Sequence, residues 1–113
     1  MWKVYKKSTA YYNVVKGKFD FLSLSPNGYH LAALDGRYFF VDKDGKEVGN
    51  YVDCSNYTAQ GYALVIKEDG MAYLVDEMLN EITTGYYADS VYSLYNGLVI
   101  IKDGQKTYFV FDK

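Results

Sequence analysis

His30 is the only histidine of the chain and Cys54 is the only cysteine, so nucleophilic catalysis would depend on these two side chains. A Ser-His-Asp or Cys-His arrangement needs the imidazole as a base, and a cysteine attacks as a thiolate, which a nearby positive charge must stabilise. In the recurring pattern of this chain, Ala63 and Val99 are the counterparts of His30. Ser90 is the counterpart of Cys54. Positions that accept such different residues are typical of structure, so we expect no catalytic residue, no cofactor and no enzymatic activity.

Metal ligands are equally sparse in this sequence. Zinc sites need clustered cysteines and histidines, and the chain has one of each. The segment Asp42-Lys43-Asp44-Gly45 resembles the start of a calcium loop, but it lacks the third acidic ligand and has Asp53 where the loop needs a bidentate glutamate. The sequence therefore predicts a hairpin turn at this position and no metal site.

Aspartates recur along the chain in two sets, Asp20, Asp53 and Asp89, and Asp42, Asp76 and Asp112. Two carboxylates in different environments could serve as general acid and general base, which leaves an enzyme with a carboxylate and tyrosine site as a third hypothesis. A carboxylate that recurs in every unit is more simply a turn cap that accepts backbone N–H bonds. We therefore expect these aspartates to be structural.

Tyrosines are the remaining residues that could have a functional role, and the chain contains fourteen of them. Part of this number belongs to a core, because tyrosine can bury its ring and keep its hydroxyl at the surface. Adjacent tyrosines in a strand must face opposite sides, so some are exposed. Tyrosine is enriched at protein interfaces. The predicted protein-binding residues are Tyr51, Tyr57, Tyr86, Tyr87, Tyr92 and Tyr95.

The elements that must position these residues are strands. Aromatic residues make up 19% of the 113-residue chain, and aromatic and β-branched side chains favour strands. Asp-Gly pairs occur at Asp35-Gly36, Asp44-Gly45, Asp69-Gly70 and Asp103-Gly104, and this dipeptide is typical of two-residue type I′ hairpin turns. We find no long segment with apolar residues at helical spacing, so the sequence predicts an all-β fold.

An internal repeat organises the chain. Asp35, Asp69 and Asp103 are each 34 residues apart. Asp20, Asp53 and Asp89 each precede a glycine by eight residues, at Gly28, Gly61 and Gly97. The sequence thus predicts about three repeats whose antiparallel hairpins form a curved sheet or a solenoid- or barrel-like array. The single domain, 1–113, would contain a partial unit 1–27, units 28–60 and 61–96, and a partial unit 97–113.

Each unit is expected to contain three short strands. The first strands are expected at 29–34, 62–67 and 98–102, and the second at 38–42, 73–76 and 107–112. A looser segment would then lead to the next unit. Near the N-terminus, the segment Trp2-Lys3-Val4-Tyr5 resembles a second strand.

This pattern resembles the WG-containing repeat family. The order of Tyr51-Val52-Asp53, Gly61-Tyr62-Ala63-Leu64-Val65, Asp69-Gly70 and Val75-Asp76 follows the family's unit, and Val41 to Val48 matches the end of a unit. The likeness covers residues 19–113 and departs at the Trp-Gly dipeptide, which is replaced by Tyr38-Phe39, Ala72-Tyr73 and Tyr108-Phe109. The resemblance implies a β-rich bacterial protein with a binding or scaffolding role.

The net charge of the chain argues against one class of partner. Lys and Arg total 12 against 14 Asp and Glu, a formal net charge of −2, which argues against a nucleic-acid binder. We find no apolar run of membrane-spanning length and no signal-peptide pattern, and one cysteine cannot form an internal disulfide. We expect a cytoplasmic, non-catalytic module that binds a protein partner and is open to self-association. The alternative is a small inhibitor of phage or mobile-element type that blocks a bacterial enzyme or defence complex.

Overall fold

The computed structural model describes residues 18–111 and shows an all-β fold, as the composition predicted. Eleven strands pair only in antiparallel fashion and form three sheets. Within these residues no helix is long and apolar enough to cross a membrane. The strands are β1 (Phe21–Ser23), β2 (His30–Leu34), β3 (Arg37–Val41), β4 (Glu47–Tyr51), β5 (Asp53–Cys54), β6 (Ala63–Ile66), β7 (Met71–Val75), β8 (Glu81–Tyr87), β9 (Ser90–Leu94), β10 (Gly97–Lys102) and β11 (Gln105–Val110).

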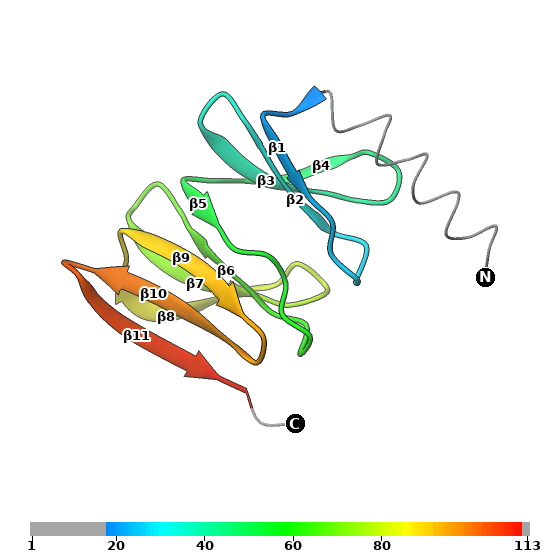
Figure 1. The fold of residues 1–113 in the computed structure, drawn as a ribbon. Helices are drawn as coiled ribbons and strands as arrows, with labels where there is room; N and C mark the ends of the chain where they lie inside the picture. Colours follow the sequence, from blue (N-terminus) through cyan, green and yellow to red (C-terminus); the bar gives the residue numbers. More distant parts are fainter. Residues whose placement is uncertain (1–17, 112–113) are drawn as a thin grey trace.

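Each sheet is a meander of consecutive strands. The first sheet has the order β1-β2-β3-β4, the second has β5-β6-β7-β8, and the third has β9-β10-β11. Figure 1 shows the three sheets following one another in chain order. The strand order is open in every sheet, so none of the three closes into a barrel within the described residues.

The predicted first and second strands are all present, and their ends differ from the predicted bounds by at most two residues. The segments expected to be looser contain strands as well. Each holds the fourth strand of one sheet and the first strand of the next, which are β4 and β5 in one case and β8 and β9 in the other. Separate sheets therefore replace the single curved sheet that the hairpin pattern suggested. The segment Trp2-Lys3-Val4-Tyr5 and Asp112 lie outside the described residues.

The hairpin turns explain why the strands begin and end where they do. Asp35 and Gly36 join β2 to β3 with φ of 53° and 78°, and Asp103 and Gly104 join β10 to β11 with φ of 51° and 78°. Positive φ at both central residues is the type I′ geometry that matches the twist of two paired strands. These two predicted turns are confirmed.

The other two Asp-Gly pairs also form hairpins, but with loops that are one residue longer. Only the glycine has a positive φ there, 84° at Gly45 and 83° at Gly70, and its N–H closes a turn onto the residue three positions earlier. This is the pattern of a three-residue hairpin loop with glycine in the left-handed conformation. The type I′ prediction is therefore wrong for Asp44-Gly45 and Asp69-Gly70.

Gly97 differs from the two glycines with which it was aligned. Gly28 and Gly61 lie in turns with φ of 88° and 89°, whereas Gly97 lies inside β10 without a positive φ. A Cβ atom at Gly97 would collide with the backbone oxygen of Phe109 on β11. Close backbone approach, and not turn geometry, therefore requires this glycine.

The core lies between the sheets. One buried cluster joins the first sheet to the second, with Leu31, Phe40 and Tyr51 on one side and Ala63, Val65 and Val75 on the other. A second cluster joins the second sheet, through Leu64, Ile66 and Ala72, to Val91, Leu98 and Ile100 of the third. A third cluster, Ala32, Phe39 and Val41, lies on the opposite face of the first sheet. Each sheet thus buries alternate residues of its strands against a neighbour.

Candidate protein-binding surface

The histidine with potential for catalysis holds a turn in this structure. His30 is half-buried at the start of β2, and its Nδ1 accepts a hydrogen bond of 2.9 Å from the backbone N–H of Ser25. Burial lowers the pKa of His30 below its ordinary value, because the charged imidazolium is poorly solvated there. A neutral imidazole that accepts a backbone N–H bond supports the loop between β1 and β2.

Cys54 is buried in the core cluster between the first two sheets. Burial and the neighbouring Asp53 carboxylate both raise the pKa of the thiol well above its ordinary value. The Sγ atom donates to the backbone oxygen of Ser55 at 3.4 Å. A thiol with these surroundings keeps its proton and packs as a small apolar side chain.

The recurring aspartates accept backbone N–H bonds at turns, as predicted. Asp42 Oδ1 accepts from Asp44 and Lys46 at 2.9 and 3.0 Å. Asp76 Oδ1 accepts from Met78 and Asn80, both at 2.9 Å. These bonds to Asn80 and Met78 hold the pKa of the Asp76 carboxyl below its ordinary value.

The second set of aspartates divides into two kinds. Asp20 and Asp89 each accept from the first residue of a type I′ turn, the N–H of Asp35 at 3.0 Å and of Asp103 at 2.9 Å. Asp53 instead reaches the next sheet, where its Oδ2 accepts from the N–H of Val91 at 3.0 Å. The expectation of one shared corner is therefore wrong for Asp53, which joins the second sheet to the third.

Within residues 18–111, no group of three or more His, Cys, Asp or Glu side chains is placed to hold an ion. The segment that resembled a calcium loop uses its Asp42 carboxylate for turn N–H groups instead.

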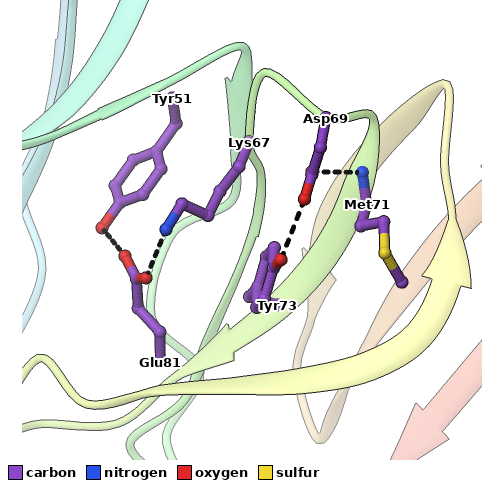
Figure 2. Close-up of polar contacts among 6 residues, drawn as sticks. All are labelled: Tyr51, Lys67, Asp69, Met71, Tyr73 and Glu81. Atoms are coloured by element: carbon purple, nitrogen blue, oxygen red, sulfur yellow. Dashed lines mark hydrogen bonds and ion pairs between the residues drawn. The ribbon is translucent and has the colours of Figure 1, made fainter.

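A polar cluster does form where the first sheet packs on the second. Figure 2 shows Glu81 of β8 accepting from the hydroxyl of Tyr51 at 3.1 Å and from Nζ of Lys67 at 2.7 Å. Beside it, the Tyr73 hydroxyl donates to Asp69 at 3.0 Å, and the Lys67 ammonium lies 5.1 Å from the Tyr73 ring centroid. Of these contacts, the hydrogen bond from Tyr51 of β4 to Glu81 joins the two sheets, and the others lie within the second sheet.

Two of the six predicted binding tyrosines are part of the core. Tyr51 is 4% exposed and Tyr57 is 6% exposed, and both pack against Phe40 with ring centroids 6.0 and 5.1 Å away. The Tyr57 hydroxyl donates to the backbone oxygen of Asp76 at 2.8 Å. Buried rings with satisfied hydroxyl groups stabilise the fold and offer no surface to a partner.

The other four predicted tyrosines are exposed, and they lie on two sheets. Tyr86 and Tyr87 are neighbours on β8, so they face opposite sides of the second sheet. Tyr92 lies on β9, and Tyr95 lies in the hairpin between β9 and β10. The structure therefore does not bring the predicted set into one patch.

One face of the third sheet does gather exposed apolar side chains. In the register of this sheet, Val99 lies opposite Tyr92 on one side and Tyr108 on the other, and Gly97 lies opposite Leu94 and Val110. Residues paired directly across antiparallel strands share a face. This face, which we call the third-sheet face, consists of Tyr92, Leu94, Val99, Ile101, Tyr108 and Val110.

The third-sheet face points away from the second sheet. The alternate residues of the same strands, Val91, Leu98 and Ile100, are the ones buried against that sheet. Tyr92 is 36% exposed, Tyr108 57% and Val110 63%, while Val99 at the centre is fully buried between them. Among the paired positions of this face, the one charged residue is Lys106.

The sequence contains a signal for this face that the tyrosine count missed. The run Leu98-Val99-Ile100-Ile101 is apolar at four successive positions, whereas a half-buried strand alternates apolar and polar residues. A continuous apolar run is typical of a strand that is covered on both faces. In the described residues only the face toward the second sheet is covered by another sheet.

No family model, no curated protein and no solved structure matches this chain.

Proposed function

We propose that this protein is a non-catalytic module that binds a protein partner through the third-sheet face. The observation that carries the proposal is the gathering of partly exposed Tyr92, Leu94, Tyr108 and Val110 on one side of one sheet. Contiguous exposed apolar surface is uncommon on soluble proteins and marks interaction sites. Rigid tyrosine rings provide much contact area at low entropic cost.

The chemistry of the face favours a protein over a small ligand. Small molecules are held in concave sites that bury most of their surface, whereas the third-sheet face is the side of a twisted antiparallel sheet. An apolar centre with aromatic residues and few charges resembles the buried centre of a protein interface. Lys106 at one end supplies a charge of the kind that interface rims carry.

The finer architecture is part of the proposal: about three units of roughly 34 residues, built as WG-containing repeats are. Support comes from the register. Leu31 and Leu64 are each the second residue of the second strand of their sheet, and each faces the sheet that follows. In this arrangement the third-sheet face is the surface that would meet the next sheet of a longer stack.

The experiment is affinity capture from the native host with the wild-type chain, followed by binding measurements on the purified partner. Tyr92→Glu together with Tyr108→Glu places two charges on the third-sheet face and should weaken binding at least about tenfold. The control is Met78→Glu, which puts one such charge at a residue that is 81% exposed in the loop between β7 and β8.

Circular dichroism first establishes that the variants keep the fold of the wild type. Equal affinity of the double variant and the wild type would contradict the proposal, and so would a selective loss with Met78→Glu. If the captured partner is an enzyme, a stoichiometric loss of its activity on adding the chain would favour the inhibitor alternative over a scaffold.

A further inference from the structure

The third sheet has one strand fewer than the other two. In the first and second sheets, β4 and β8 occupy the fourth position beside β3 and β7. The corresponding position beside β11 has no strand among residues 18–111, and Figure 1 shows β11 at the end of the molecule. An edge strand of this kind carries unpaired backbone groups that can template a further strand.

The hydrogen bonds of the third sheet show which groups of β11 are free to pair. The Ile101 carbonyl accepts from the N–H of Asp89 at 2.6 Å, on the side away from β11, so the pair of Ile101 and Lys106 exchanges no bonds. Beyond the strand, the Phe111 N–H donates back to Asn96. Along a β-strand, successive residues direct their backbone groups to opposite sides. The N–H and C=O groups of Lys106, Tyr108 and Val110 therefore point away from β10, toward the open edge.

On the second sheet, Ile82 and Tyr86 lie next to the open position beside β11. We call these two residues the side wall, which is apolar and only partly covered. Ile82 pairs with Leu74, and Tyr86 packs edge-on against Phe109 of β11 with ring centroids 6.4 Å apart, so both face the third sheet. They remain 48% and 51% exposed.

The role of a fourth strand can be seen at the interface between the first and second sheets. There β4 supplies Tyr51, which is buried between the sheets and donates to Glu81 of β8. Beside β11, no strand of the described residues closes the gap over Ile82 and Tyr86 in this way.

We propose that the edge of β11 accepts an extended segment of the partner protein as the fourth strand of the third sheet. The proposal rests on the proposed function and names the mode of binding. The segment would span five to seven residues, as β4 and β8 do, and place an apolar or aromatic side chain against Ile82 and Tyr86. Main-chain bonds to Lys106, Tyr108 and Val110 would supply affinity, and the side wall would supply selectivity.

A second copy of the chain fits this position less well. Two β11 strands paired antiparallel would be related by a two-fold axis perpendicular to the sheet, which keeps the faces of both copies on the same sides. The second sheet of the other copy would then lie on the same side as β8 and compete for the gap. A single extended strand fills the position as β4 and β8 fill theirs.

The test uses the full chain and a capped synthetic peptide of residues 80–88, which carries the β8 sequence and therefore suits a fourth position. Amide hydrogen exchange is followed by NMR with and without the peptide. We expect slower exchange at Lys106, Tyr108 and Val110 by a factor of ten or more. We expect little change at Thr107 and Phe109, which already bond to β10.

Two variants keep the test decisive. Lys106→Pro removes one edge N–H and leaves the bonds to β10, and it should weaken peptide binding at least tenfold, while Lys106→Ala stays within twofold. If Lys106→Pro does not fold, a peptide N-methylated at alternate residues removes the same pairing and should not protect the wild-type edge.

Several results would overturn this proposal. They are unchanged exchange at the three edge amides, full binding of the N-methylated peptide, or edge amides that are already protected in the free chain or become so with rising protein concentration. A captured partner that binds Lys106→Pro as tightly as wild type, yet is lost with the Tyr92→Glu and Tyr108→Glu variant, would refute strand addition and leave the proposed function intact.

Discussion

At the scale of single residues, the side chains that could have taken part in catalysis stabilise the fold instead. His30 accepts a backbone N–H, Cys54 is a buried thiol, and Asp42 and Asp76 each accept the N–H groups of their own turns. Leaving a buried backbone N–H without an acceptor costs more folding free energy than a typical hydrogen bond contributes, so these caps stabilise the protein.

Buried tyrosines make the stability of this protein sensitive to alkaline pH. Burial raises the pKa of Tyr51 and of Tyr57 far above the ordinary value of 10.0. Above pH 10 the unfolded chain therefore loses protons that the folded chain retains. Because the folded state then binds more protons, the free energy of unfolding falls as the pH rises, by up to about 1.4 kcal/mol per pH unit for each tyrosine.

Urea denaturation between pH 8 and pH 11 measures this slope. Tyr51→Phe with Tyr57→Phe should flatten it, because phenylalanine has no proton to lose, and should cost about 1 kcal/mol per lost hydroxyl bond at pH 8. Tyr108→Phe, at an exposed position, is the matched control and should keep the wild-type slope. The same slope in the double variant would show that other groups cause the effect.

At the scale of elements, the turns determine where the strands pair. Both type I′ hairpins have an aspartate and a glycine with positive φ, and an upstream aspartate accepts the first turn N–H. The three-residue loops at Gly45 and Gly70 have one left-handed residue instead. The β7–β8 loop follows the same plan with Leu79 at a φ of 66°, a conformation that disfavours leucine.

Gly36→Ala should lower the free energy of unfolding by about 1 kcal/mol, because alanine is strained at a φ of 78°. The cost is one of conformation alone, since a Cβ atom there meets no heavy atom within 4 Å. Asp35→Asn is the control, since asparagine tolerates positive φ and its backbone N–H can still donate to the Asp20 carboxylate. Chemical denaturation compares the two. Wild-type stability of Gly36→Ala would show that this turn is not held in the type I′ form.

Local signals predicted the hairpins well and the surrounding strands poorly. An Asp-Gly pair between apolar runs acts over a few residues, so β2, β3, β10 and β11 could be predicted with their approximate bounds. β5 has only two residues, Asp53 and Cys54, and is defined by its partner β6. No periodicity can be read in so short a segment, so the division into sheets had to come from the structure.

At the scale of the whole molecule, the stacking of sheets decides which tyrosines reach the surface. Tyr51 and Tyr57 lie in a segment that the sequence analysis expected to be looser, yet both pack between the first and second sheets. Tyr92 and Tyr108 belong to the last sheet and remain exposed. The exposure of a tyrosine depends on whether another sheet packs over its own sheet, and this cannot be predicted from the neighbouring residues in the sequence.

The stack also gives the two ends of the molecule different properties. On the far face of the first sheet, Ala32 and Val41 are buried. On the third-sheet face, the central Val99 is buried as well, but Tyr108 and Val110 beside it remain largely exposed. This difference supports the proposal that a partner adds at the third sheet. This asymmetry connects the proposed binding face with the free edge of β11.

In the proposed binding mode, the third-sheet face is exposed in the free protein and covered by a partner in the complex. Tyrosine nitration mapped by mass spectrometry, with the free chain and with its captured partner, tests both halves of that claim in one measurement. We predict that Tyr92 and Tyr108 are modified in the free chain and protected in the complex, while Tyr51 and Tyr57 stay unmodified in both. Equal modification of Tyr92 and Tyr108 in the two samples would contradict the claim.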